Sequence, residues 1–218
     1  MTTLTSEPLA TLLEDLFDQA DAAHDSSFDG LSADEQARLM HSRTDYLALY
    51  GRLKNLWLPV SRDTGRLLYL LARSSGARTI VEFGTSFGIS TLHLAAALRD
   101  NGGGTLVSSE FEPGKVQRAR AHLAAAGLDD LVDIRQGDAL QTLRQDLPER
   151  IDMVLLDGAK PLYSDILLLL EDRLAPTAVI VADNADYAPD YLAHVRAPGR
   201  GYLSVAVGEE VEVSMRVG

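Results

Sequence analysis

Acidic and amide side chains stand at the ends of five consecutive apolar segments of this chain. The segments are short and rich in β-branched residues, which predicts buried parallel strands. In an open α/β sheet, ligands bind beyond the carboxyl ends of such strands. Each residue alone could be a turn residue or a helix cap, but the recurrence indicates a polar site. The residues are Glu82, Glu110, Asp138, Asp157 with Lys160, and Asp183 with Asn184.

A glycine-lined turn follows the first of these segments. Gly84 and Gly88 lie between a strand that ends at Phe83 and a helix that begins near Ile89. Such a turn presents backbone N–H groups at a helix N-terminus and lets a ligand approach the backbone closely. The alternative is a tight strand-to-helix turn that binds nothing.

Glu110 indicates which ligand this turn would receive. It ends the next strand, twenty-two residues after Gly88, where a carboxylate can accept hydrogen bonds from both hydroxyls of a ribose. The glycine spacing departs from the Gly-x-Gly-x-x-Gly of dinucleotide-binding proteins, and the surrounding carboxylates would repel a pyrophosphate. They suit a neutral ribose and a cationic sulfonium, so the sequence favours S-adenosylmethionine over NAD.

The composition restricts the class of protein. Of the 218 residues, 46% are hydrophobic and 24% are charged, as in a globular protein with a sizeable core. The formal net charge of -12 argues against a nucleic-acid or anionic-membrane partner. Cysteine is absent, which excludes disulfides, thiolate metal sites and a cysteine nucleophile. We see no signal peptide and no segment long enough to span a membrane, and we expect a soluble cytoplasmic protein.

Alternating strand and helix patterns predict how the polar residues are positioned. The alternation implies a doubly wound, mostly parallel sheet with right-handed crossovers. An antiparallel C-terminal hairpin around Gly208 would complete seven strands in one α/β domain over residues 56–218. The expected strands are 78–83, 105–110, 132–135, 151–157, 178–184, 202–207 and 211–217. The expected helices are 64–74, 89–98, 113–126, 139–147, 162–174 and 190–196.

Residues 1–55 are expected to form an N-terminal helical cap. Leucines recur at helical spacing between residues 7 and 23. Ser32 and Glu35 have the spacing of a capping box, which would begin a second helix that extends to about Asn55. Neither helix belongs to a βαβ unit, so we expect a lid or a dimer surface. Their apolar faces suggest a homodimer.

The segment Glu82-Phe83-Gly84-Thr85-Ser86-Phe87-Gly88-Ile89-Ser90 resembles the first motif of class I methyltransferases. It has the Glu-x-Gly-x-x-x-Gly-x-Ser form of the cation-dependent O-methyltransferases, a family that includes the catechol and caffeoyl-CoA enzymes. Further stretches are similar to that family over roughly residues 55–218. They are Val60-Ser61 with Asp63, Glu110, Gly137-Asp138, the Asp-x-x-Lys-x-x-Tyr pattern at 157–163, and Ala182-Asp183-Asn184.

The resemblance implies a Rossmann-like methyltransferase fold that uses S-adenosylmethionine and a divalent cation, Mg²⁺ or alternatively Mn²⁺ or Ca²⁺. It assigns the metal to Asp157, Asp183 and Asn184, whose hard oxygen ligands suit these cations. Lys160 would be the catalytic residue that accepts the proton of the substrate hydroxyl. The cofactor-binding residues would be Val60, Glu82, Gly84, Ser86, Gly88, Ser90, Glu110, Asp138 and Asp157.

The expected function is therefore cation-dependent methylation of a hydroxyl on a small molecule, in particular a catechol-like phenol. Two alternatives stay open: methylation of a non-aromatic hydroxyl on a sugar or polyketide, and non-catalytic binding of an adenosyl ligand. The chain departs from the family pattern at two points. The segment from Asn184 to the hairpin is shorter than in the caffeoyl-CoA enzymes. No carboxylate near the hairpin is identified that would contact the second catechol hydroxyl.

Overall fold

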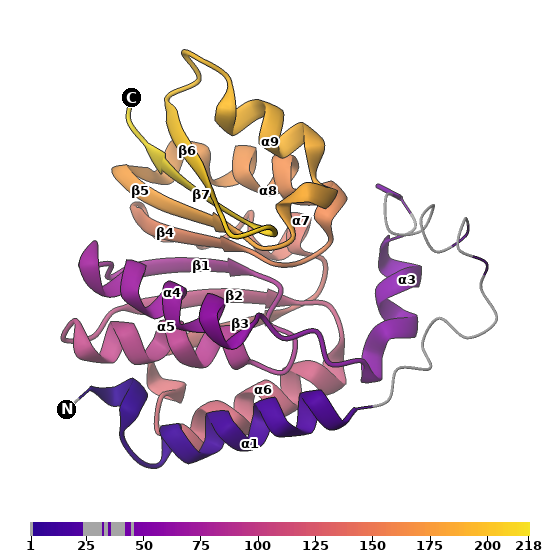
Figure 1. The fold of residues 1–218 in the computed structure, drawn as a ribbon, viewed down its shortest axis with the longest axis vertical. Coiled ribbons are helices and arrows are strands. Elements are labelled where there is room, and N and C mark those ends of the chain that lie inside the picture. The colour runs from indigo at the N-terminus through magenta and orange to yellow at the C-terminus, as the bar shows by residue number, and fades with distance from the viewer. Residues whose placement is uncertain (1, 24–31, 33–34, 36–41, 45) are drawn as a thin grey trace.

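The computed structural model describes residues 2–23, 32, 35, 42–44 and 46–218. These residues fold around a seven-stranded sheet of order β3-β2-β1-β4-β5-β7-β6. Its strands are parallel from β3 to β5, and β7 pairs antiparallel with both β5 and β6. The predicted sheet and its C-terminal hairpin are confirmed (Figure 1). The strands are β1 (Thr79–Phe83), β2 (Thr105–Glu110), β3 (Val132–Gln136), β4 (Ile151–Leu156), β5 (Leu174–Ala182), β6 (Tyr202–Val207) and β7 (Val211–Arg216).

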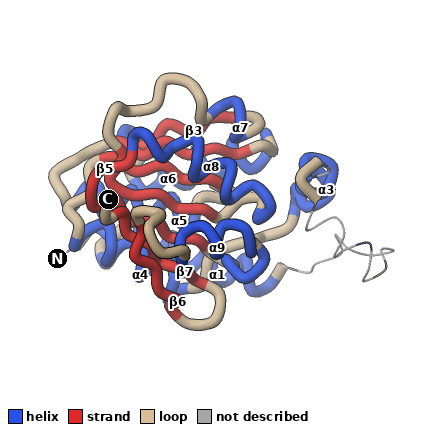
Figure 2. The backbone as a smooth tube through the Cα atoms, turned by 90° about the horizontal axis from the view of Figure 1, so that it is seen from above, coloured by secondary structure: helices blue, strands red, loops and turns tan. Residues whose placement is uncertain are grey.

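Helices cover both faces of the parallel strands, which explains why those strands are apolar on both sides. One hydrophobic core lies between the sheet and α1, α4, α5 and α6, and a second lies between the sheet and α7, α8 and α9 (Figure 2). No described helix is long and apolar enough to cross a membrane. The helices are α1 (Leu9–Ala22), α3 (Tyr46–Arg52), α4 (Arg62–Ser74), α5 (Ile89–Asp100), α6 (Pro113–Ala126), α7 (Ala139–Thr142), α8 (Tyr163–Leu170) and α9 (Pro189–Arg196). Short 3₁₀ turns occupy Thr3–Thr5, Leu53–Asn55, Asp129–Leu131, Lys160–Leu162, Glu171–Arg173 and Ala185–Tyr187.

Two helices end earlier than the sequence pattern predicts. The expected helix 139–147 stops at Thr142, because the Arg135 guanidinium donates hydrogen bonds to the carbonyl oxygens of Thr142 and Asp146 at 3.0 and 2.9 Å. The expected helix 162–174 begins at Tyr163 and stops at Leu170, and β5 begins at Leu174 rather than 178. Pro176 favours the extended conformation for the residue before it, which lengthens β5 at the expense of the helix.

The first predicted helix belongs to the main core. Four side chains of α1, Leu9, Leu13, Leu16 and Phe17, are buried in the core that contains α5 and α6. The apolar face that suggested a dimer surface is therefore covered by the chain itself. The homodimer stays a prediction.

The second predicted helix lies partly outside the described residues. Within them, the Ser32 hydroxyl accepts a hydrogen bond from the Glu35 N–H, and the Glu35 carboxylate accepts one from the Ser32 N–H, as the capping box predicts. The later part of the segment forms α3, which stands at the carboxyl ends of the parallel strands (Figure 1). This position makes α3 one wall of the site described below.

A close backbone contact fixes the turn after β1. Gly84 has a φ of +104°, and a Cβ atom added there would lie 2.5 Å from the carbonyl oxygen of Asp157. The backbone of the turn therefore touches the end of β4, and the Asp157 N–H donates to the Phe83 carbonyl at 2.8 Å. Only glycine permits both this conformation and this contact.

We predict that Gly84→Ala destabilises the fold by about 3 kcal/mol or more, because a backbone clash adds to the cost of a positive φ. Gly127→Ala is the matched control. Gly127 also has a positive φ, +65°, but nothing lies within 4 Å of its added Cβ, so we expect a loss of about 1–2 kcal/mol. Urea denaturation of both variants measures the difference, and equal losses would show that the contact with Asp157 is unimportant.

Candidate functional site

Two cavities meet at the carboxyl ends of β1, β2, β4 and β5. The first lies between α3 and the ends of β1 and β2, and we call it the nucleoside cavity. The second lies between α3, α1 and the end of β5, and we call it the acidic cavity. Tyr50, Leu58 and Asp157 line both. A small third cavity beside the β1–α5 turn is also lined by Leu58 and Asp157, so these two residues border all three cavities.

Glu110 lies at the centre of the nucleoside cavity. Its two carboxylate oxygens accept backbone hydrogen bonds from Ser86 at 2.7 Å and Glu112 at 2.9 Å. Each oxygen keeps a second lone pair for a ligand. Ser86 has an unusual φ of +48°, and its buried hydroxyl has no hydrogen-bond partner among the described residues. The turn thus offers a carboxylate and an unused hydroxyl on the same side.

Asp138 lines the same cavity and is also the N-cap of a helix, the structural alternative given for such residues above. Its carboxylate caps α7 by accepting from the Leu140 N–H at 3.0 Å. The Tyr46 phenol of α3 lies close to it, and burial together with the charge of Asp138 raises the pKa of Tyr46. This contact connects the wall formed by α3 to the end of β3.

Seven of the nine predicted cofactor-binding residues line these cavities. They are Val60, Gly84, Ser86, Ser90, Glu110, Asp138 and Asp157. Gly88 does not line them: it ends the turn at a φ of +90°, and a Cβ there would meet the Ala119 Cβ of α6 at 3.2 Å. Its role in this structure is the close packing of α5 and α6.

Glu82 does not line them either. Its side chain is fully buried and accepts hydrogen bonds from the hydroxyls of Ser90, Thr91 and Ser108 at 2.5 to 2.7 Å. Burial raises its pKa to about 7, although the three hydroxyl donors oppose this shift. The structure therefore places Glu82 behind the turn, where it connects β1 with β2 and the first turn of α5.

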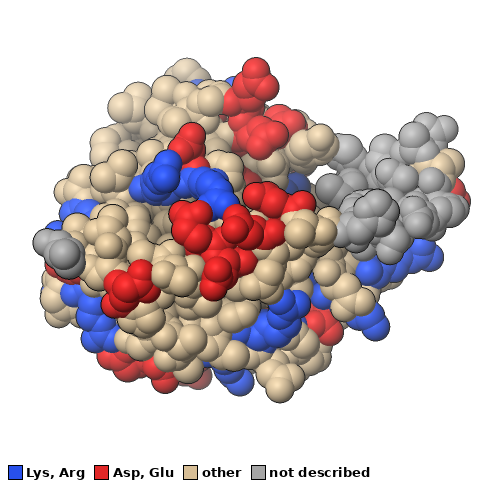
Figure 3. Space-filling view, turned by 60° about the horizontal axis from the view of Figure 1, so that its bottom comes forward, with Lys and Arg blue, Asp and Glu red and all other residues tan. Residues whose placement is uncertain are grey.

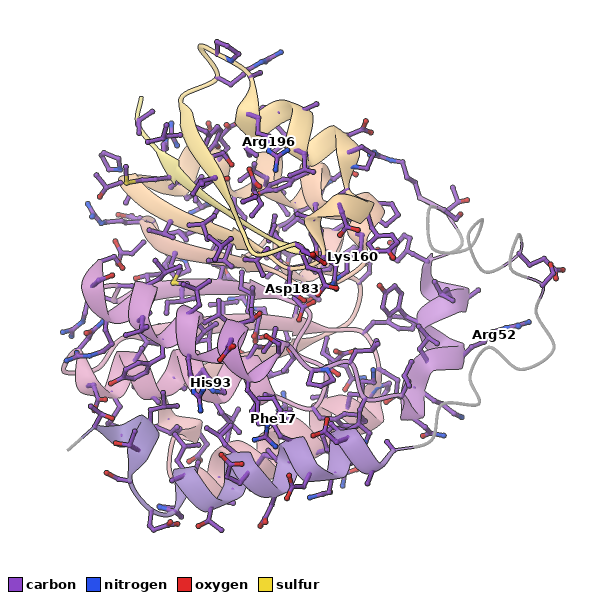
Figure 4. All side chains as sticks on the ribbon, in the orientation of Figure 1. Phe17, Arg52, His93, Lys160, Asp183 and Arg196 are labelled. Carbon is purple, nitrogen blue, oxygen red and sulfur yellow. The ribbon has the colours of Figure 1, made fainter. Side chains whose placement is uncertain are left out.

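The acidic cavity contains the predicted metal ligands and the predicted base. Lys160 Nζ lies 2.9 Å from an Asp157 carboxylate oxygen, and the Lys160 side chain is 9% exposed. Burial would lower the pKa of Lys160, but the adjacent Asp157 carboxylate raises it. Burial and the charge of Asp157 raise the pKa of Asp183 to about 7. Lys160 and Asp183 are labelled side by side in Figure 4.

The donor set at this point fits a hard divalent cation. The described residues contain no cluster of three or more His, Cys, Asp or Glu side chains that could hold a metal. The predicted set instead combines two carboxylates with the Asn184 amide, which a φ of +48° holds at the end of β5. Oxygen ligands of this kind suit Mg²⁺ better than zinc. Burial and the charge of Asp157 both raise the pKa of Asp183, and a bound cation would favour its ionised form.

Glu210 is a site residue that the sequence analysis missed. It lies in the β6–β7 turn and lines the acidic cavity, and its carboxylate accepts from the Asn184 amide at 3.4 Å. Its carbonyl oxygen also accepts from the Ala185 N–H at 2.9 Å. The acidic pair Glu209-Glu210 in a hairpin turn was the available signal. Its meaning depends on β7 pairing with β5, which brings the turn to Asn184.

Salt bridges fix the outer wall of the acidic cavity. Arg62, at the start of α4, pairs with Glu14 and Asp18 of α1 at 2.7 and 3.1 Å, and its guanidinium lies 4.5 Å from the centroid of the Phe17 ring. Figure 3 shows acidic and basic side chains gathered together on the face that includes the bottom of Figure 1, where α1 lies. These contacts hold α1 against α4 beside the cavity.

Known proteins with similar sequences are methyltransferases. A family described as a methyltransferase domain matches residues 81–185. The catechol O-methyltransferase of Niastella koreensis is 36% identical over 130 residues, which cover 58% of this chain and 58% of that protein. The catechol O-methyltransferase of Sus scrofa is 32% identical over 149 residues, 65% of this chain and 79% of that protein. The match to the Niastella protein thus spans less than two thirds of its length.

Solved structures extend the similarity over nearly the whole chain. The O-methyltransferase TomG from Streptomyces achromogenes, involved in tomaymycin synthesis and solved in complex with S-adenosylmethionine, superposes with a TM-score of 0.67. It is 25% identical, and the match covers 94% of this chain and 96% of that one. The fold is therefore shared over most of both chains.

We predict that Glu82→Gln changes how stability depends on pH. Because burial raises the pKa of Glu82 from 4.5 to about 7, the folded chain binds more protons than the unfolded chain between these values. Ionisation of Glu82 therefore lowers the free energy of unfolding as the pH rises through this window. The uncharged amide of the Glu82→Gln variant would avoid this loss, so the variant should gain about 2–3 kcal/mol relative to wild type between pH 4.5 and 8.

Urea denaturation of both proteins at several pH values measures this difference. Glu149→Gln, at an exposed position, is the control and should follow wild type throughout. Parallel profiles for Glu82→Gln and wild type would show that the three hydroxyl donors keep Glu82 ionised in the folded chain.

Proposed function

Because the chain belongs to the class I S-adenosylmethionine-dependent O-methyltransferases, we propose that it transfers a methyl group from S-adenosylmethionine to a hydroxyl of a small molecule. We further propose that a divalent cation assists and that the substrate is a catechol-like phenol. One observation carries the proposal: Asp157 lines both the nucleoside cavity and the acidic cavity. A ligand in the first would thus meet a ligand in the second beside one carboxylate.

The nucleoside cavity has the chemistry of an adenosyl site. The Glu110 carboxylate can accept from ribose hydroxyls, and the apolar side chains of Phe111 and Ala139 flank the space for a base. The third cavity extends toward Val60 and Ser90, where the amino-acid end would lie. The carboxylates of Glu110 and Asp157 also favour the positive charge of a sulfonium.

The acidic cavity would orient the substrate. The cofactor would supply the methyl group, and a cation held by Asp157, Asp183 and Asn184 would lower the pKa of a substrate hydroxyl. Glu210 faces the same space and can accept a hydrogen bond from a neighbouring hydroxyl. Substrates with two adjacent oxygens would satisfy both groups. The apolar walls, which include Phe17, Leu53, Leu56, Leu58 and Pro59, suit an aromatic ring.

Lys160 would accept the hydroxyl proton. In the structure it is held as an ammonium by Asp157, at 2.9 Å, so it must lose a proton before it can act as a base. Asp157 is also a proposed metal ligand. With a cation held there, Asp157 would stabilise the ammonium less, so that Lys160 could release its proton to solvent. The neutral amine would then lie beside the substrate oxygen, within the cavity that it already lines.

We predict that a chelator abolishes methylation of a catechol and that Mg²⁺ or Mn²⁺ restores it. Asp183→Ala should lose activity and weaken Mn²⁺ binding, which paramagnetic resonance of free Mn²⁺ measures without turnover, while binding of S-adenosylhomocysteine by calorimetry stays largely unchanged. Asp190→Ala is the control, because the Asp190 side chain is 85% exposed and lines neither cavity. Full turnover in excess chelator would refute the cation assignment.

We predict that Lys160→Met lowers kcat by about 10²–10⁴-fold at neutral pH, because the substrate hydroxyl loses its proton acceptor. Methionine keeps the length of the side chain, so affinities for S-adenosylhomocysteine and Mn²⁺ should change little. Higher pH should partly restore kcat, since hydroxide can then remove the proton.

Lys54→Met is the matched control, because Lys54 is exposed and should retain wild-type kcat. A Lys160→Met enzyme with wild-type kcat at neutral pH would remove Lys160 from the mechanism. A wild-type chain that binds the cofactor but methylates no hydroxyl would instead support the non-catalytic alternative.

A further inference from the structure

Lys115 carries a positive charge that no other part of the described chain neutralises by direct contact. The residue lies in the first turn of α6 and is only 4% exposed. Among the described residues its ammonium forms no ion pair and no hydrogen bond, and its nitrogen lies 5.3 Å from the centroid of the Phe87 ring. Burial of a cation without a paired anion is costly. The described residues therefore provide a ring contact for this ammonium but no anion and no hydrogen-bond acceptor.

The position of Lys115 points to a ligand in the nucleoside cavity. Lys115 lines that cavity together with Ser86 and Glu110, and it lines neither the acidic cavity nor the third cavity. Burial lowers the pKa of Lys115, and the charges of Glu110 and Glu112 partly oppose this shift. The nearby carboxylates thus keep an ammonium available without binding it directly.

Ser86 is a second unused polar group at the same place. Its hydroxyl is buried without a hydrogen-bond partner in the described part of the chain, while its N–H donates to Glu110 at 2.7 Å. The cavity thus has a carboxylate that can accept and two groups, the Lys115 ammonium and the Ser86 hydroxyl, that can donate. A pair of adjacent hydroxyls would use all of them, because each hydroxyl both donates and accepts.

We propose that Lys115 is a further cofactor-binding residue, whose ammonium donates a hydrogen bond to a ribose hydroxyl oxygen of the adenosyl ligand while Glu110 accepts from the same diol. The inference rests on the proposed function only for the adenosyl identity of the ligand. The amino-acid carboxylate is the anionic group of the same ligand that a lysine could bind instead. It would lie in the third cavity, which Lys115 does not line.

The test compares two variants and two ligands. Lys115→Met removes the ammonium, and Lys54→Met, at an exposed position, is the control. Calorimetry with S-adenosylhomocysteine should show affinity about 10–100-fold weaker for Lys115→Met and unchanged for Lys54→Met, since a hydrogen bond from a charged donor is lost. Competition by adenosine should weaken likewise, whereas competition by 2′,3′-dideoxyadenosine should be the same for Lys115→Met and wild type.

Thermal unfolding separates binding from folding. If the buried ammonium serves a ligand, its removal should leave the Tm of the ligand-free chain unchanged or higher. If Lys115→Met lowers both the Tm and the affinity, and Lys115→Arg restores neither, then Lys115 serves folding and the proposal is overturned. Equal losses for adenosine and dideoxyadenosine, or no loss for either, would overturn the ribose contact. A wild-type chain that binds no S-adenosylhomocysteine would instead refute the proposed function itself.

Discussion

The buried carboxylate of Glu82 holds the turn between β1 and α5 in place at the carboxyl end of the sheet. Three hydroxyls donate to it, one from β2 and two from the first turn of α5, so it fixes how the helix leaves the strand. Desolvation of a carboxylate is unfavourable, and its raised pKa reports that cost. These hydrogen bonds fix the turn between Gly84 and Gly88 relative to β2. That position brings the Gly84 backbone against Asp157 and directs the Ser86 N–H at Glu110.

The same turn explains why Asp157 can serve two cavities. Because Gly84 has no side chain, β4 ends in contact with the turn, and the Asp157 carboxylate emerges between the nucleoside cavity and the acidic cavity. Lys160 follows three residues later, at the start of a 3₁₀ turn, and its ammonium pairs with the Asp157 carboxylate at 2.9 Å. Backbone contact therefore sets the distance between the two proposed reactants, while the charged side chains set the electrostatics around them.

The sequence predicted most of the fold because local signals were unambiguous there. Helix α6 has the predicted bounds, since Pro113 starts it and Gly127, with a φ of +65°, follows its last residue. The predicted ends of α7 and α8 were wrong because they depend on contacts outside the helices. The end of α7 depends on Arg135, which donates to carbonyls seven and eleven residues away, and the end of α8 depends on Pro176. The role of Glu82 could not be read from strand alternation, which does not say whether a carboxylate at a strand end faces a ligand or three buried hydroxyls. Glu210 required the pairing of β7 with β5, which joins residues far apart in the chain.

The buried charged residues of this molecule are of two kinds: some hold the fold together, and others line the proposed binding site. Glu82 and Glu212 are buried with their hydrogen bonds complete: hydroxyls surround the first, and Arg196 with Ser204 surrounds the second. Asp183 and Lys115 are buried with their charges poorly compensated. Burial and the charge of Asp157 raise the pKa of Asp183, and the Lys115 ammonium contacts the Phe87 ring but has no ion-pair or hydrogen-bond partner among the described residues. Burial of either kind costs free energy, but the hydrogen bonds of Glu82 and Glu212 connect elements of the fold, whereas the charges of Asp183 and Lys115 do not. Both line a cavity at the same end of the sheet, as expected if their compensation comes from ligands rather than from the chain.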